Sequence, residues 1–126
     1  MDITLYHNPA CSTSRKALAA LQDAGHQPVV IDYLKAGWTR PQLEDLFAAA
    51  GLTPREALRT RGALAGDLGL LESSVPDEAL LEAMVAHPVL VERPFVQTPD
   101  GARLCRPLER LFELVGLPDS TSADPA

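Results

Sequence analysis

Hydrophobic and polar positions change period twice within the first 31 residues. Residues 3–6 (ITLY) form a short apolar run with β propensity, which a breaker cluster at residues 7–9 ends. Residues 12–24 then place apolar side chains at helical spacing, and Gly25 follows as a helix-ending residue. Residues 29–31 are continuously apolar, which is typical of a buried strand. The order strand, helix, strand predicts a right-handed βαβ unit.

The middle of the chain has the helical period. Thr39 is typical of a helix start because a proline follows in the first turn, and apolar residues then recur at helical spacing up to Gly51. Thr53 opens a further short helix, and residues 77–87 show a third helical pattern. We therefore expect an all-helical insertion at about residues 39–87.

The last third returns to short β runs. The expected elements, in chain order, are strands at 89–91 and 95–97, a turn at 98–101, a return strand at 102–105 and a helix from Pro107 onward. Polar residues 118–126 are expected to form a flexible tail. The whole order predicts a single α/β domain over residues 1–117: a mixed sheet (β-α-β, helical insertion, β-β-α) with flanking helices.

The composition fits one globular domain. The chain has 126 residues, 46% of them hydrophobic, and 17 acidic against 11 basic side chains give a net charge of −6. A net acidic domain is poorly suited to nonspecific nucleic-acid binding. No segment is long and apolar enough to cross a membrane, and the first residues do not resemble a signal peptide. We expect a cytoplasmic protein that binds neither nucleic acid nor membranes.

Two cysteines, Cys11 and Cys105, lack the spacing of a metal site. Cys11 stands directly before the predicted helix, where free N–H groups and the helix dipole lower the pKa of a thiol. The hydroxyls of residues 12–14 and the charge of Arg15 strengthen this tendency. The alternative is that these hydroxyls only cap the helix and that Cys11 is a small buried side chain.

Arginines stand beside several predicted strand ends and breakers: Arg59, Arg61, Arg93, Arg103 and Arg106. The planar guanidinium suits tetrahedral anions because it offers several donors in a fixed geometry. The alternative is that each is a solvated surface residue. His7 similarly either stabilises a thiolate, or moves a proton, or is a hydrogen-bonded structural histidine.

Two segments carry a resemblance to a known family. ITLYHNPACSTSRKAL and HPVLVERPFVQTPDGARLCRP resemble the two signatures of the glutaredoxin-coupled arsenate reductases of the ArsC family. The resemblance extends from Ile3 to about Phe112 and implies a thioredoxin-like fold with a helical insertion. The implied catalytic residues are Cys11 and the arginines Arg59, Arg93 and Arg106, which also bind the anion. The resemblance further implies that the thiol-loop residues His7, Asn8 and Ser14 contribute to substrate binding and that Pro94 is a cis-proline near the site.

The resemblance also implies a reaction. Arsenate would be reduced to arsenite through a covalent Cys11–arsenate intermediate, with glutathione as co-substrate and glutaredoxin as the reductant. No metal and no bound organic cofactor is implied, and we expect a monomer.

Two related classes compete with this interpretation. Phosphatase-like arsenate reductases use a C-x5-R anion loop, and they are excluded because Ala17 stands six positions after Cys11. Regulators of the Spx type share the fold, bind RNA polymerase and typically carry C-x-x-C, but here the second position is Ser14. A redox-sensing transcriptional regulator of this type, or another thiol-dependent oxidoreductase of the same fold, is the alternative.

Reduction of As(V) requires a second thiol. Ser14 cannot supply it, and Cys105 is the other cysteine of the chain. Neighbouring side chains on a strand point to opposite faces, so Cys105 faces away from the anion if Arg106 faces it. We therefore expect the resolving thiol to be external, supplied by glutathione.

Overall fold

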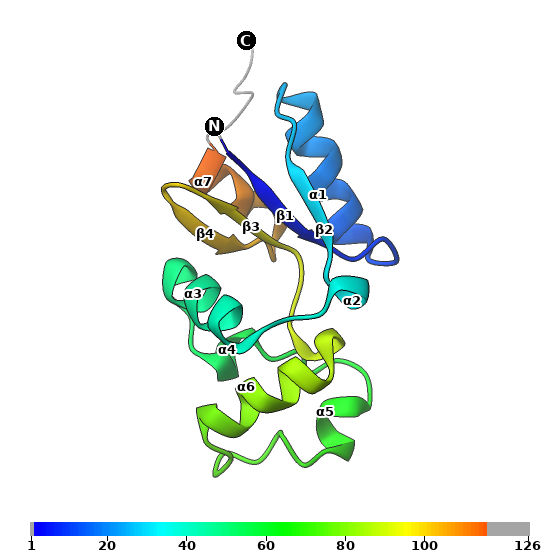
Figure 1. Cartoon of the computed structure of the whole chain (residues 1–126). Coiled ribbons are helices and arrows are strands. Elements are labelled where there is room, and N and C mark those ends of the chain that lie inside the picture. The colour runs from blue at the N-terminus through cyan, green and yellow to red at the C-terminus, as the bar shows by residue number, and fades with distance from the viewer. Residues whose placement is uncertain (1, 116–126) are drawn as a thin grey trace. The chain divides into compact units, whose positions relative to one another are not determined.

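The computed structural model describes residues 2–115. Its elements, shown in Figure 1, are β1 (Thr4–His7), α1 (Ser12–Asp23), β2 (Val29–Asp32), α2 (Tyr33–Ala36), α3 (Arg40–Ala50), α4 (Pro54–Ala57), α5 (Leu64–Asp67), α6 (Asp77–Ala86), η1 (Pro88–Leu90), β3 (Phe95–Thr98), β4 (Gly101–Leu104), η2 (Leu108–Leu111) and α7 (Phe112–Val115). The chain divides into two compact units. We call them the sheet unit, whose described residues are 2–32 and 93–115, and the helical unit, residues 33–92.

The sheet unit contains one four-stranded mixed sheet. Its strand order is β2-β1-β3-β4, with β1 parallel to β2 and antiparallel to β3. The β3–β4 pair is an antiparallel hairpin in which Thr98 stands opposite Gly101. The predicted mixed sheet and the predicted turn at 98–101 are therefore confirmed.

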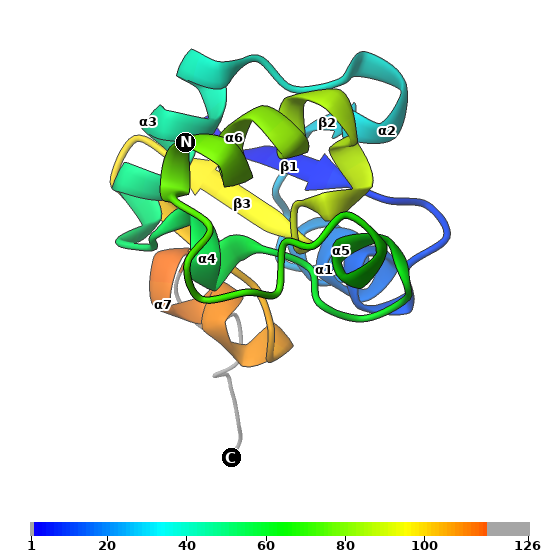
Figure 2. The ribbon, with the colours of Figure 1, turned by 90° about the horizontal axis from the view of Figure 1, so that it is seen from below.

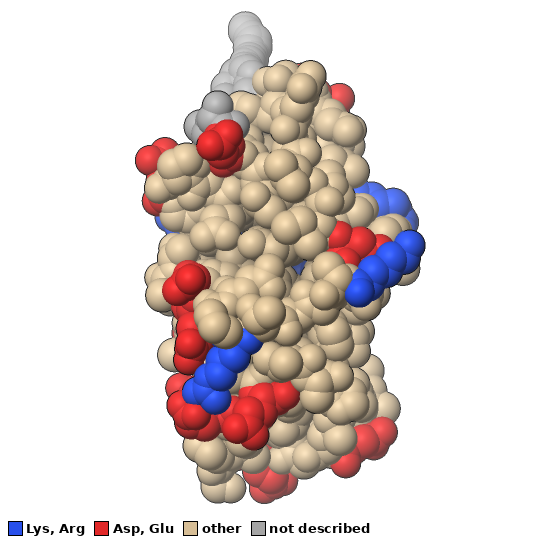
Figure 3. Space-filling model, in the orientation of Figure 1, with Lys and Arg blue, Asp and Glu red and all other residues tan. Residues whose placement is uncertain are grey.

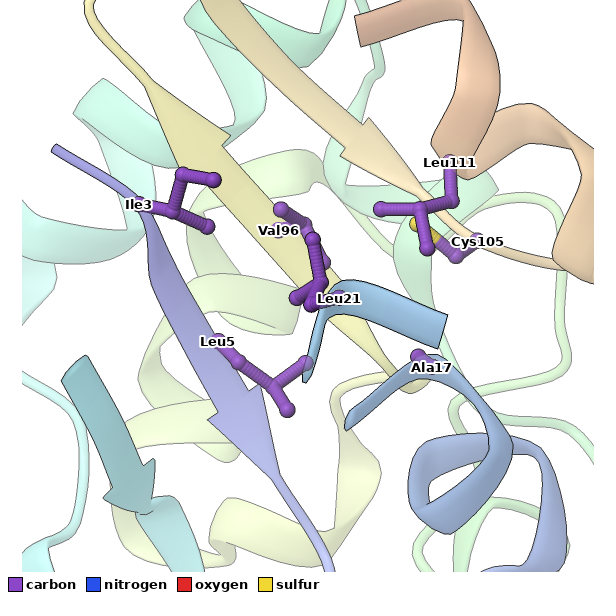
Figure 4. Close-up of a cluster of buried hydrophobic side chains, with 7 residues drawn as sticks. All are labelled: Ile3, Leu5, Ala17, Leu21, Val96, Cys105 and Leu111. Atoms are coloured by element: carbon purple, nitrogen blue, oxygen red, sulfur yellow. The ribbon is translucent and has the colours of Figure 1, made fainter. Parts of the chain in front are cut away.

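Helix α1 packs its apolar stripe into the core of the sheet unit. Ala17 and Leu21 of α1 are completely buried, and they join residues of the strands and of the C-terminal segment in one cluster. Figure 4 shows the members of this cluster: Ile3, Leu5, Ala17, Leu21, Val96, Cys105 and Leu111. The helix ends at Asp23 and is capped by Ala24, and Gly25 follows with a φ of 87°, which is readily adopted only by glycine. This packing fixes the start of α1 next to the end of β1.

Three predicted elements differ in the structure. The run at 29–31 is not a buried strand, because β2 is an edge strand with Val29 62% exposed and Val30 44% exposed. An apolar run indicates a strand without indicating whether it lies at the edge of the sheet. The run at 89–91 is not a strand either: i→i+3 hydrogen bonds wind Pro88–Leu90 into a 3₁₀ turn, and only Val91 forms a β-bridge, with Leu58.

The last predicted helix begins as a 3₁₀ turn, Leu108–Leu111, and continues as the single-turn helix Phe112–Val115. The predicted flexible tail, residues 118–126, lies outside the described residues.

The helical unit is assembled from short capped helices. Thr39 and Thr53 each start a helix with a reciprocal capping box, which satisfies backbone N–H groups that a helix start leaves free. Helix α6 packs against α3 and α4, as Figure 2 shows from below. The predicted helical insertion at 39–87 falls within this unit. No helix among residues 2–115 combines the length and the apolar character that a membrane crossing needs.

Candidate active site

A tight loop connects β1 to α1 and holds Cys11 at its end. The backbone N–H of Cys11 donates to the carbonyl of Asn8 at 2.9 Å, and the N–H of Ala10 donates to Oδ1 of Asn8 at 3.0 Å. Cys11 has extended backbone angles and occupies the N-cap position of α1. Its sulfur therefore lies where the first N–H groups of a helix have no partners within the helix.

Buried polar side chains support this loop. Nδ1 of His7 lies 2.6 Å from Oγ of Ser14, and the same oxygen accepts the backbone N–H of Asn8 at 3.0 Å. Ser14 is 0% exposed, and His7 and Asn8 are also buried. Buried polar groups of this kind need hydrogen-bond partners, and these three residues provide them for one another.

The protonation state of His7 agrees with this arrangement. Burial lowers the pKa of His7 below its ordinary value, while nearby Asp32 opposes the shift and Arg15 adds to it. At Nδ1 a neutral imidazole can accept a hydrogen bond from the Ser14 hydroxyl. The Ser14 oxygen can then accept a second hydrogen bond from the backbone N–H of Asn8. His7 is thus part of the support of the thiol loop.

The surroundings of Cys11 favour a thiolate. Partial burial raises the pKa of Cys11, but the backbone N–H groups of Ser14 and Thr13 and the guanidinium groups of Arg93 and Arg106 outweigh it, so the net shift is downward. Nη1 of Arg106 lies 3.8 Å from the Cys11 sulfur and also donates to the carbonyl of Arg93 at 3.0 Å. The sulfur and the two arginines form a positively charged group that can receive an anion.

Cys105 has the opposite environment. It is 0% exposed, packs in the core cluster of Figure 4, and its pKa rises to about 12, chiefly because of burial. Its neighbour in the chain, Arg106, points to Cys11. Cys105 therefore faces away from the side chain of Arg106, as expected. The reason is not alternation along a strand, because β4 ends at Leu104.

The third predicted anion-binding residue, Arg59, belongs to the helical unit and already has a partner. Its Nη1 donates to Oε1 of Glu92 at 2.9 Å, and both side chains are mostly buried, at 19% and 16% exposure. The backbones of Arg59 and Glu92 are held next to each other by the β-bridge between Leu58 and Val91. On either side of this bridge, the N–H of Arg59 donates to the carbonyl of Leu90 at 2.7 Å, and the N–H of Glu92 donates to the carbonyl of Ala57 at 2.8 Å. No pattern along the chain indicated a role for Glu92.

The remaining residues singled out in the sequence have separate positions. Arg61 is exposed, and Arg103 pairs with Glu113 at 3.1 Å. Pro94 is buried, and the Arg93–Pro94 peptide bond is cis, as the resemblance implied. Among residues 2–115, no group of three or more His, Cys, Asp or Glu side chains is arranged to hold a metal ion.

Comparisons with known proteins agree with one another. The model of the ArsC family matches residues 6–114. The chain is 56% identical over 113 residues to an arsenate reductase of Synechocystis sp., which covers 90% of this chain and 81% of the relative. It is 44% identical over 119 residues to the arsenate reductase of Escherichia coli K12, covering 94% and 83% respectively. The solved structure of the arsenate reductase from Vibrio cholerae aligns with a TM-score of 0.87 and 40% identity, over 90% of this chain and 98% of that one. The predicted thioredoxin-like α/β fold is confirmed by this match.

Proposed function

This chain belongs to the ArsC family, and from that premise we propose that it is an arsenate reductase with Cys11 as its nucleophile. The observation that carries the proposal is the placement of the Cys11 sulfur at the start of α1, 3.8 Å from Nη1 of Arg106. An activated thiol next to fixed guanidinium groups is suited to attack on an oxyanion, because the cations offset the repulsion between thiolate and anion.

The first step forms a sulfur–arsenic bond. Arsenate binds at Arg93, Arg106 and the N–H groups of the first turn of α1. The Cys11 thiolate attacks arsenic, the bond from arsenic to one arsenate hydroxyl breaks, and this hydroxyl takes up a proton and leaves as water. The product is a Cys11–arsenate adduct in which arsenic is still As(V). On the family resemblance we also assign Arg59 to this anion, which requires its guanidinium to share its donors between Glu92 and the substrate.

The second step reduces the arsenic. The thiolate of glutathione attacks the Cys11 sulfur, a sulfur–sulfur bond forms, and the electron pair of the sulfur–arsenic bond remains on arsenic. Each sulfur loses one electron, arsenic gains two, and arsenite leaves as As(III). Glutaredoxin then removes glutathione from Cys11 by thiol–disulfide exchange and restores the thiolate.

An external thiol is part of the proposal for two reasons. Cys105 is buried and its pKa rises to about 12, so it is neither accessible nor ionised at neutral pH. Position 14 carries a serine, so the first turn of α1 holds no second thiol. Glutathione and glutaredoxin place the reaction in the cytoplasm, and neither a metal nor a bound organic cofactor takes part.

The test is arsenate-dependent oxidation of NADPH in the presence of glutathione reductase, glutathione and glutaredoxin. We expect sustained turnover with wild-type protein and none when thioredoxin and thioredoxin reductase replace the glutathione system. Mass spectrometry of quenched samples should find glutathione on Cys11. Full activity with thioredoxin, together with an accumulating disulfide between Cys11 and Cys105, would contradict the external thiol. A reactive Cys11 without any arsenate-dependent turnover would instead favour a redox-sensing regulator.

A further inference from the structure

Arg15 lies over the thiol loop and has no role in the steps above. Its backbone N–H donates to the carbonyl of Cys11 at 3.0 Å, within the first turn of α1. Its side chain is exposed but does not extend freely into solvent: Nη1 donates to the carbonyl of Pro9 at 2.7 Å. This contact fixes a cationic group on the rim of the loop that ends in Cys11.

No carboxylate among residues 2–115 forms an ion pair with Arg15. Among the described residues, the arginine ion pairs involve Arg40, Arg59, Arg103 and Arg110, each with a glutamate. Arg15 takes part in none of them, although acidic residues outnumber basic ones by 17 to 11 and are widespread on the face shown in Figure 3. One of its five N–H donors is used by Pro9, so the others remain available.

Arg15 also differs from the two arginines at the sulfur. Arg93 and Arg106 lower the pKa of Cys11 through side-chain hydrogen bonds, whereas the side chain of Arg15 donates to the carbonyl of Pro9. It also contributes to the lowered pKa of His7, at the start of the same loop. Its guanidinium is therefore held at the carbonyl of Pro9, two residues before Cys11, where it can meet a part of a ligand other than the atom that contacts the sulfur.

We propose that Arg15 binds a carboxylate of the thiol co-substrate, the anionic tripeptide glutathione. This inference rests on the proposed function, because that reaction brings glutathione to Cys11. The carboxylates of glutathione are several bonds away from its sulfur, so its thiol can reach Cys11 while a carboxylate lies at the rim. A guanidinium that is already held in place binds a carboxylate with less loss of side-chain entropy than a mobile one. The site favours glutathione over uncharged thiols.

The decisive experiment does not use arsenate. In a Cys105→Ser background, Cys11 is reacted with oxidised glutathione and, separately, with the uncharged hydroxyethyl disulfide. The Cys11 thiolate attacks one sulfur of the disulfide, a mixed disulfide forms, and the other half leaves as a thiolate. The ratio of the two rates cancels any change in the pKa of Cys11. We expect Arg15→Gln to lower this ratio by about three- to fivefold, as for an exposed charge pair, and Arg15→Lys to retain part of it.

Lys16→Gln is the matched control. Lys16 is also exposed and stands one residue further along α1. Its replacement by glutamine removes one positive charge, as Arg15→Gln does, but from a side chain that points in another direction around the helix. The rate ratio should stay near the wild-type value in this variant. An unchanged ratio in Arg15→Gln, or an equal loss in Lys16→Gln, would overturn the site. Circular dichroism checks the fold of each variant, and Arg15→Lys provides a second variant if Arg15→Gln does not fold.

Steady-state kinetics add an independent measurement. If arsenate is reduced, Arg15→Gln should raise the KM for glutathione several-fold and leave the KM for arsenate unchanged. The defect should disappear when an uncharged thiol replaces glutathione. If arsenate is not reduced, the proposed function fails, but the disulfide rate ratio still decides whether Arg15 recognises glutathione.

Discussion

Desolvation acts in the same direction on both cysteines of this chain, but Cys11 is partly buried and Cys105 is completely buried. Burial raises the pKa of both thiols, yet the net shift is downward at Cys11 and upward, to about 12, at Cys105. The Cys11 sulfur accepts hydrogen bonds from backbone N–H groups and from two guanidinium groups. Cys105 packs among hydrophobic side chains, and the charges of Arg110 and Arg103 lower its pKa less than burial raises it. The depth of burial and the donors near the sulfur together decide whether a thiol is a nucleophile or a hydrophobic side chain.

The largest expected difference between the two thiols concerns turnover. Cys11→Ser should abolish arsenate reduction, because a serine hydroxyl is not ionised at neutral pH. Cys105→Ser should retain much of the activity, since Cys105 lies in the core. The coupled NADPH assay measures both, with circular dichroism to verify folding. Comparable losses in two folded variants would contradict a single nucleophile.

Removal of one guanidinium should move Cys11 toward the behaviour of an ordinary thiol. Arg106→Gln is expected to raise the pKa of Cys11 and to lower kcat/KM for arsenate by about 10- to 100-fold, the effect of a charge-assisted hydrogen bond. The pKa is measured from the pH dependence of Cys11 alkylation in a Cys105→Ser background, where wild type should titrate below the ordinary thiol range of about 8.5.

Arg103→Gln is the control for that measurement, because Arg103 pairs with Glu113 and makes no contact with Cys11 among the described residues. It should leave both the alkylation profile and the kinetics close to wild type. A Cys11 pKa that is equal in Arg106→Gln and wild type would show that Arg106 does not activate the thiol and would leave that role to the helix start and Arg93.

The ionisation of Cys105 should affect how the free energy of unfolding depends on pH. The folded protein keeps its proton on Cys105 up to about pH 12, whereas an unfolded thiol loses it near about 8.5. The unfolded state therefore binds fewer protons in this range, and stability falls as pH rises, by at most about 1.4 kcal/mol per pH unit from this group. Urea unfolding of Cys105→Ala should show a flatter decline above pH 9 than wild type. Parallel curves would contradict the raised pKa.

The smallest effect on the thiol is expected from the Ser14 hydroxyl. The backbone N–H of Ser14, not its side chain, lowers the pKa of Cys11. Ser14→Ala should therefore change the alkylation profile little, while it destabilises the fold by about 1 to 3 kcal/mol, because His7 and the Asn8 N–H lose a buried partner. Urea unfolding and alkylation of the same variant separate the two effects.

The sequence predicted local features of the site better than long-range ones. The strand, loop and helix around Cys11 follow from breakers and periodicity within about twenty residues, and the structure has them with closely similar bounds. The edge position of β2 and the 3₁₀ turn at Pro88–Leu90 depend on which segments become neighbours in the fold. A local sequence pattern carries no information about these neighbours. The positions of Arg93 and Arg106 near Cys11 were implied only by the family resemblance, and the pair of Arg59 with Glu92 was not anticipated at all.

The exposed edge of the sheet bears on how molecules of this protein behave at high concentration. Strands at a free edge can add strands from other molecules, and β2 presents Val29 and Val30 to solvent. This strand is only four residues long, Pro28 removes a donor directly before it, and Asp32 places a carboxylate at its end. The free edge is thus short and bounded by residues that oppose further pairing, which limits self-association through β2 while its two valines remain exposed.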